Sequence, residues 1–136
     1  MQFPILGLVD NDNMLYVFEN DKHLKNTSLE LYNRRGSQPN ERYIDSKGNI
    51  FKVKRVKNLG YKGLFGFSLL LKGRQIRIET EFYPVSEVMD LQEVKKIISE
   101  RVDKKKGFWQ SSWDIGELKQ KINNAESFKN LFLLLK

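Results

Sequence analysis

A change in the spacing of apolar residues near Pro84 constrains the fold of this chain more than any other feature. Before Pro84, short runs in which apolar and polar residues alternate are separated by turn-forming residues, which is typical of strands. After Pro84, apolar residues recur at helical spacing behind capping residues. Strands followed by helices predict an α+β fold. We therefore expect a largely antiparallel sheet from the N-terminal two thirds, with the C-terminal helices packed on one of its faces.

The N-terminal part predicts a hairpin and then less regular structure. Residues 3–9 and 14–18 flank a turn made only of Asp and Asn, whose side chains bond to the nearby backbone. Residues 29–33 alternate weakly and predict a further strand. Residues 34–40 contain several turn formers and predict a polar loop.

A second hairpin is predicted from residues 42–44 and 50–57. The turn between them contains Gly48, where a positive φ is needed. The alternation of the second strand changes phase near Arg55, which predicts a β-bulge at that point.

A third hairpin is predicted from residues 65–71 and 75–83, after a glycine-rich link at residues 59–66. In residues 75–83 the alternation predicts two faces. One carries Ile76, Ile78, Thr80 and Phe82, and the other carries Arg77, Glu79 and Glu81.

Three helices are predicted after Pro84. Asp90 with Glu93 forms a capping box before a helix that ends near residues 104–107, and Asp114 with Glu117 begins a second. Ser127 caps a third, short helix. The apolar stripe of the first helix consists of Leu91, Val94, Ile97, Ile98 and Val102.

Length and composition limit the classes of protein to which this chain can belong. With 136 residues and no internal repeat, the chain fits a single domain that spans residues 1–136. It has no cysteine, which excludes disulfides, thiolate catalysis and cysteine zinc sites. Its N-terminus has no secretory pattern, and no apolar run is long enough to span a membrane. We therefore expect a cytoplasmic protein that does not bind membranes.

The charge of the chain is concentrated in its middle third. The formal net charge is +7, and nine basic residues and no acidic one lie between Asp45 and Glu79. Such a one-signed stretch is expected to form a positive surface that attracts an anionic partner. The alternative is a solvated sheet face that lysines keep soluble. The nine residues are Lys47, Lys52, Lys54, Arg55, Lys57, Lys62, Lys72, Arg74 and Arg77.

Signals for catalysis or for a metal site are weak, and we expect neither an enzyme nor a cofactor. His23 is the only histidine and lies in a polar stretch, which favours an exposed loop. Glu79 and Glu81 point the same way on one strand, as paired carboxylates of a hydrolase or nuclease would. Arg77 lies in the same row, so a ladder of surface charges is the favoured interpretation.

Nucleic-acid binding is the alternative function. Aromatic residues such as Phe51, Tyr61, Phe65 and Phe67 are interleaved with the basic block, as in RNA-binding sheets. However, Phe51 alternates with the lysines, so the aromatic and cationic side chains are expected on opposite faces. A core requires that arrangement, whereas a base-stacking surface would need both on one face.

Both tryptophans, Trp109 and Trp113, lie between two of the predicted helices. An exposed indole there would be a good anchor for a protein partner, because tryptophan is enriched at interface hot spots. The alternative is that the indoles fill the gap between helices and sheet.

The segment from Tyr43 to Val53 (YIDSKGNIFKV) is followed by a hairpin and by capped helices that end near Phe128. In this order of elements the chain resembles small immunity proteins of bacterial polymorphic toxin and contact-dependent growth inhibition systems. The resemblance implies a non-enzymatic cytoplasmic protein that binds a cognate toxin domain and blocks its active site. Inhibitors of nucleases are expected to be acidic, whereas this chain is basic. The toxin is therefore expected to present an acidic patch or not to be a nuclease.

The sequence thus predicts a binding protein with an acidic protein partner and with no metal or cofactor. The predicted partner-binding residues are Lys52, Lys54, Arg55, Lys57, Arg74 and Arg77, with Trp109 or Trp113 as the anchor.

Overall fold

The computed structural model describes residues 1–10, 12–61, 74–85 and 87–136. Within these residues the strands form one antiparallel sheet of order β2-β1-β4-β5-β6-β3, and β7 pairs with β5. The strands are β1 (Ile5–Val9), β2 (Leu15–Phe18), β3 (Asn26–Ser28), β4 (Glu41–Ile44), β5 (Asn49–Tyr61), β6 (Gln75–Phe82) and β7 (Glu87–Val88). The helices are α1 (Asp21–Leu24), α2 (Leu29–Arg35), α3 (Leu91–Lys104), α4 (Lys106–Trp109), α5 (Ile115–Asn124) and α6 (Phe128–Leu133).

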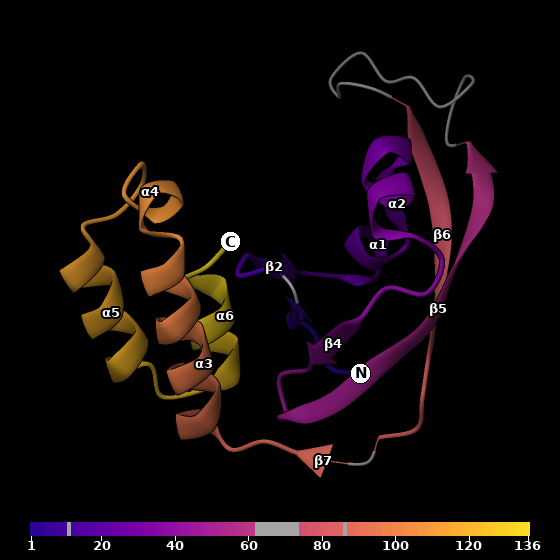
Figure 1. Ribbon diagram of the computed structural model, residues 1–136. Helices are drawn as coiled ribbons and strands as arrows, with labels where there is room; N and C mark the ends of the chain where they lie inside the picture. The colour runs from indigo at the N-terminus through magenta and orange to yellow at the C-terminus, as the bar shows by residue number, and fades with distance from the viewer. Residues whose placement is uncertain (11, 62–73, 86) are drawn as a thin grey trace.

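The predicted α+β architecture is confirmed. Figure 1 shows α3, α4, α5 and α6 together on one side of the sheet, and α1 and α2 beside the long β5–β6 ribbon. No helix in the described ranges is long and apolar enough to cross a membrane.

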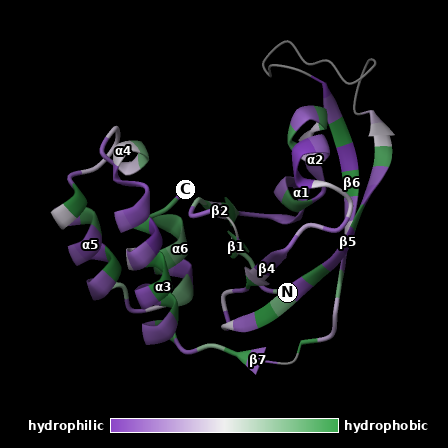
Figure 2. Ribbon diagram, viewed as in Figure 1, coloured by the Kyte–Doolittle hydropathy of each residue, from purple (hydrophilic) through white to green (hydrophobic). Residues whose placement is uncertain are grey.

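Both N-terminal hairpins form where the turn residues predicted them. β1 pairs with β2, and β4 pairs with β5 around a turn in which Gly48 has a φ of +83°. The register of β5 against β6 shifts between Val53 and Arg55, which confirms the predicted bulge. Along the β5–β6 ribbon, Figure 2 shows hydrophobic and hydrophilic residues in alternation.

Of the predicted strands, one is helical and another lies outside the described residues. Residues 29–33 are not a strand but belong to α2, because Ser28 caps a helix there by accepting a hydrogen bond from the Leu31 amide. Leu29 and Tyr32 then lie one turn apart and pack on the same core. The predicted strand at residues 65–71 lies outside the described residues, and β6 pairs instead with β5 and β3.

The C-terminal helices begin at the predicted residues. Asp90, Asp114 and Ser127 each accept a hydrogen bond from the amide three residues further on, at 2.9, 2.9 and 3.1 Å. The predicted stripe of α3 faces the core, where Val94, Ile98 and Val102 are fully buried.

The sheet separates two apolar cores because neighbouring strand residues point to opposite faces. The larger core lies between the sheet and the C-terminal helices and includes Leu6, Leu8, Ile44 and Phe132. The smaller core lies on the other face, where side chains of α1 and α2 pack against it; it contains Ile5, Tyr43, Val53, Val56, Ile76 and Ile78.

Gly48 lies where the sheet meets the helical layer. An added Cβ would lie 2.4 Å from the Met89 carbonyl oxygen and 2.9 Å from Cζ of Phe128. We predict that Gly48→Ala lowers the free energy of unfolding by about 2–4 kcal/mol, because it adds backbone strain at positive φ to overpacking. Urea unfolding would measure this loss. Gly36→Ala is the control for backbone strain without contacts, since Gly36 has a φ of +80° and a ψ of 175° but open space around its Cβ position. Equal losses for the two variants would contradict the role given to the contacts.

Candidate protein-docking surface

The β5–β6 ribbon carries the predicted basic residues on one face, which we call the outer basic face. Val53 and Val56 of β5 are buried in the smaller core. Strand alternation and the bulge therefore turn the basic side chains toward solvent. The outer basic face comprises Lys52, Lys54, Arg55, Lys57 and Arg77, with Glu79 and Glu81 among them.

Glu81 holds two of these cations in place. Nη2 and Nε of Arg55 donate to Oε2 of Glu81 at 2.9 and 3.1 Å, and Nζ of Lys57 lies 2.8 Å from Oε1. Hydrogen bonds from Lys57 and Arg55 lower the pKa of the Glu81 carboxyl. The three groups together keep one net positive charge. Glu81 therefore stays ionised beside these cations. A general acid would instead need a raised pKa.

The charges of Lys52 and Lys54 are accessible to a binding partner. Both are exposed, and neither forms an ion pair with a residue in the described part of the chain. Nζ of Lys54 lies 5.8 Å from the centre of the Tyr83 ring, and the Tyr83 amide donates to the Lys52 carbonyl. This end of the ribbon therefore presents, beside an aromatic ring, two cations that are not neutralised by any described carboxylate.

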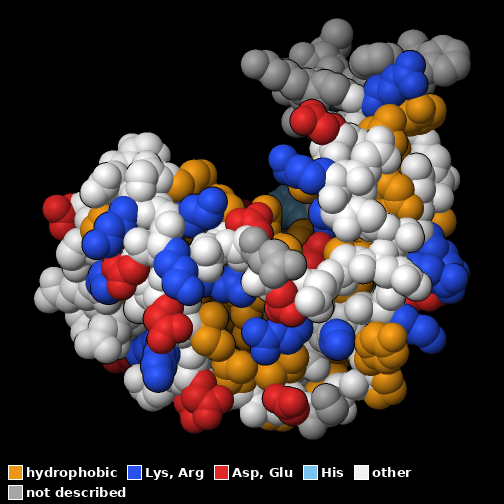
Figure 3. All heavy atoms as spheres, in the orientation of Figure 1, with side chains coloured by type: hydrophobic (Ala, Val, Ile, Leu, Met, Phe, Trp, Pro, Cys, Tyr) orange, Lys and Arg blue, Asp and Glu red, His pale blue; other side chains and the backbone are white. Residues whose placement is uncertain are grey.

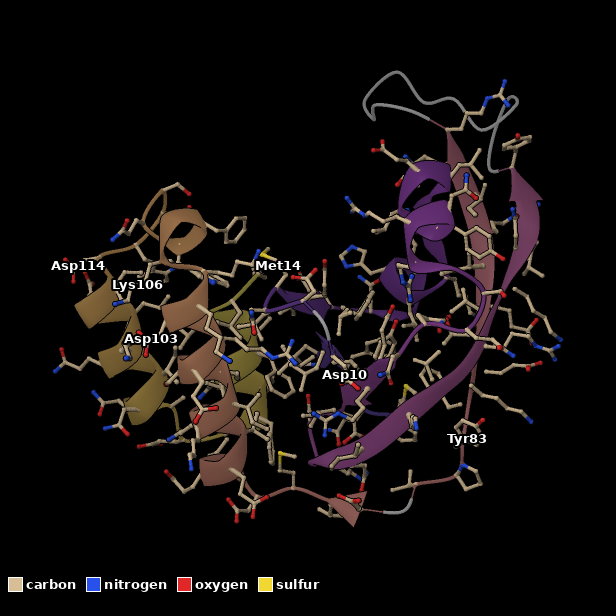
Figure 4. All side chains as sticks on the ribbon, viewed as in Figure 1. Asp10, Met14, Tyr83, Asp103, Lys106 and Asp114 are labelled. Atoms are coloured by element: carbon tan, nitrogen blue, oxygen red, sulfur yellow. The ribbon has the colours of Figure 1, made fainter. Side chains whose placement is uncertain are left out.

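Exposed apolar side chains adjoin these cations. Tyr83 is 47% exposed and Val85 is 43% exposed. Figure 4 labels Tyr83 on the side of the sheet away from the C-terminal helices. Figure 3 shows basic side chains next to a hydrophobic patch at the lower right, where β6 ends in Figure 1. Residue-by-residue interpretation of the sequence missed Tyr83. The available signal was Pro84, which ends the strand and leaves Tyr83 outside the buried alternation.

Arg74 and Arg77 lie at the opposite end of the ribbon. The guanidinium of Arg74 lies 5.1 Å from the centre of the Tyr61 ring, and its Nη1 donates to the Tyr61 hydroxyl at 2.8 Å. Arg77 is exposed in register with Gly60. The structure thus brings all six predicted cations onto one ribbon, along roughly 30 Å of strand. Lys47 is exposed in the turn before β5, and Lys62 and Lys72 lie outside the described residues.

The predicted aromatic anchors do not lie on this ribbon. Trp109 is only 5% exposed and belongs to the larger core, so it is not a surface anchor. The short helix α4 turns its indole inward and leaves the neighbouring Phe108 53% exposed. Trp113 is half-buried, with Nζ of Lys121 5.9 Å from its ring centre. Figure 1 shows α4 and α5 far from the β5–β6 ribbon.

The described residues offer no arrangement for metal chemistry. No group of three or more His, Asp or Glu side chains among them could hold a metal ion. His23 is exposed, as predicted, but it lies in α1 rather than in a loop, and its Nδ1 accepts a hydrogen bond from the Glu19 amide.

Comparisons with protein-family models, curated protein sequences and solved structures found no match to this chain.

Proposed function

We propose that this protein is a non-catalytic binding protein, an immunity protein that binds an acidic surface of a cognate toxin domain and blocks its active site. The observation that supports this proposal most directly is that Lys52 and Lys54, which form no ion pair with any described residue, lie beside exposed Tyr83 and Val85. Immunity function in particular is suggested by the resemblance of the predicted order of elements to that of such proteins.

Each part of this surface has a physical role in protein recognition. An aromatic side chain with an apolar neighbour supplies area that binding removes from water. Surrounding cations accelerate the encounter with an acidic surface and orient it. Glu81 already restrains Arg55 and Lys57, so less side-chain freedom is lost when these residues meet a partner. The proposed anchor is therefore Tyr83, in place of Trp109.

The charge of the outer basic face can be reversed without touching the core. We predict that the double variant Lys52→Glu/Lys54→Glu slows association with the toxin domain by about tenfold or more at low salt, because steering depends on charge. Stopped-flow or surface plasmon resonance would measure the rate. Lys96→Glu/Lys129→Glu is the matched control, since it makes the same change of net charge at exposed residues of α3 and α6.

The partner for this experiment is a protein that both wild type and the control variant retain from the native host, whether or not the reversed variant retains it. Its expression should stop bacterial growth, and co-expression of wild type should restore growth. An unchanged association rate in the reversed variant would refute the docking surface. Failure of the captured protein to arrest growth would refute the immunity function alone.

Nucleic-acid binding remains a second candidate, and the two tyrosines favour it. Tyr61 and Tyr83 are exposed and adjoin Arg74 and Lys54, so aromatic rings and cations meet at solvent. Phe51 instead packs edge-on against Phe82, as the alternation predicted. A salt titration of binding to random RNA or DNA distinguishes the two functions. Phosphate contacts give a steep linear fall of log affinity with log salt, and no binding at low salt would dismiss this candidate.

A further inference from the structure

A cavity of about 390 Å³ lies on the sheet face opposite the C-terminal helices, between β1, β2 and β4 on one side and α2 and β3 on the other. The surface is hollowed next to α1 and α2 (Figure 3). We propose that this cavity binds a small, mainly aromatic molecule that carries one anionic group. The volume falls in the lower range of small-molecule sites, which are mostly apolar with a few convergent polar groups. The site is separate from the outer basic face and does not depend on its function.

Gly7 shapes the apolar wall of the cavity. A Cβ at this position would lie 3.0 Å from Cε2 of Phe18 and 3.5 Å from Cε1 of Tyr43. The missing side chain lets both rings lie close over β1, with their centres 5.1 Å apart. The wall therefore offers ring faces and edges, against which a flat aromatic group packs well.

The charges deep in the cavity are already balanced. Glu41 is buried, and its two carboxylate oxygens accept hydrogen bonds from Nε and Nη2 of Arg35 at 2.7 and 2.8 Å. The Tyr43 hydroxyl joins this pair, at 3.3 Å from Nη2 of Arg35. A bidentate pair with its hydrogen bonds made has no net charge to offer a ligand.

The carboxylate at the rim is held by hydrogen bonds within the chain. Oδ1 of Asp12 accepts from the Met14 amide at 2.9 Å, and Oδ2 accepts from the Tyr16 hydroxyl at 3.2 Å. Arg101 of α3 lies on its other side and donates to the Asp12 carbonyl at 2.7 Å. Both carboxylate oxygens of Asp12 are therefore occupied by donors of the chain, and attraction to Asp12 opposes the burial that lowers the pKa of Arg101.

Arg34 carries the remaining charge at the rim of the cavity. It lines the cavity from α2, it is exposed, and it forms no ion pair with any residue that the structure describes. Burial and Asp12 raise the pKa of the Tyr16 phenol while Arg34 opposes them, so Arg34 acts near the same rim. An apolar wall beside a guanidinium that forms no ion pair with the described residues suits a carboxylate, sulfonate or phosphate joined to a ring.

The test uses 4-phenylbutanoate as the probe and 4-phenylbutanol as its uncharged counterpart, in ¹H–¹⁵N NMR titrations of the full chain. We expect saturable shifts at residues around the cavity for the acid, and at least about fivefold weaker binding for the alcohol. Arg34→Gln should weaken binding of the acid about fivefold and leave the alcohol unchanged. Asn40→Trp should abolish binding of both, because an indole at this exposed rim residue would cover the opening.

The controls separate this site from the rest of the surface. Lys52→Glu/Lys54→Glu should bind the probe as wild type does, since both residues lie outside the cavity lining. Dispersed spectra would verify that each variant is folded. Absence of saturable shifts in wild type would overturn the proposal. So would equal affinity for acid and alcohol, or an affinity that neither Arg34→Gln nor Asn40→Trp changes.

Discussion

Replacing Glu41 by alanine is expected to lower the free energy of unfolding by about 3–5 kcal/mol. Glu41 is only 4% exposed, and both its carboxylate oxygens are occupied by Arg35. The substitution would leave the Arg35 guanidinium, which is itself mostly buried, without a partner. An unpaired charge in such a place costs far more than the pair contributes. Urea unfolding followed by circular dichroism would give the change.

A double substitution tests this explanation. In Arg35→Met/Glu41→Leu no charge is left unpaired, so the stability should return to within about 1–2 kcal/mol of wild type or exceed it. The Tyr43 hydroxyl would then lose its partners in the pair, which limits the recovery. If the double variant is less stable than Glu41→Ala, the loss does not come from an unpaired charge.

Phe132→Ala is expected to lower the free energy of unfolding by about 3–5 kcal/mol, through lost burial and the cavity that remains. Phe132 of α6 is fully buried in the larger core, with its ring centre 6.0 Å from that of Phe128. It helps to attach the helical layer to the sheet. Thermal or urea unfolding followed by near-ultraviolet circular dichroism would measure the loss.

Phe108→Ala is the matched control for this prediction. It removes the same atoms from a side chain that is 53% exposed on α4, so we expect a loss below about 1 kcal/mol. Similar losses for the two variants would mean that the larger core does not carry the stability assigned to it.

The two cores have different consequences for the proposed functions. Val53, Val56, Ile76 and Ile78 of the smaller core form the inner side of the β5–β6 ribbon. The outer basic face and the cavity therefore share this core as their support. Phe132 lies on the other side of the sheet, so its loss tests stability without altering either surface directly.

Local signals predicted most elements of this fold. The caps at Asp90, Asp114 and Ser127, the turn at Gly48 and the bulge near Arg55 act through atoms a few residues apart. Such signals can be seen in a sequence because the groups that satisfy each other are neighbours in the chain.

The charged surface of the β5–β6 ribbon was less predictable from the sequence than the helices and strands. Alternation placed the cations of β5 opposite Val53, but the pairing of Arg55 and Lys57 with Glu81 depends on the register of β5 against β6. A register is set by contacts between distant segments, so spacing alone did not show which cations stay free.

By itself the sequence determined the α+β class, the starts of the C-terminal helices, the first two hairpins and the basic character of one strand. Only the tertiary structure decided that residues 29–33 are helical, that Trp109 is buried and Tyr83 exposed, and that Arg35 meets Glu41 at the cavity. The physical reason is the distance along the chain over which each interaction acts. Propensity, capping and alternation act within one or two turns of chain, whereas burial and charge pairing depend on which distant segments come into contact.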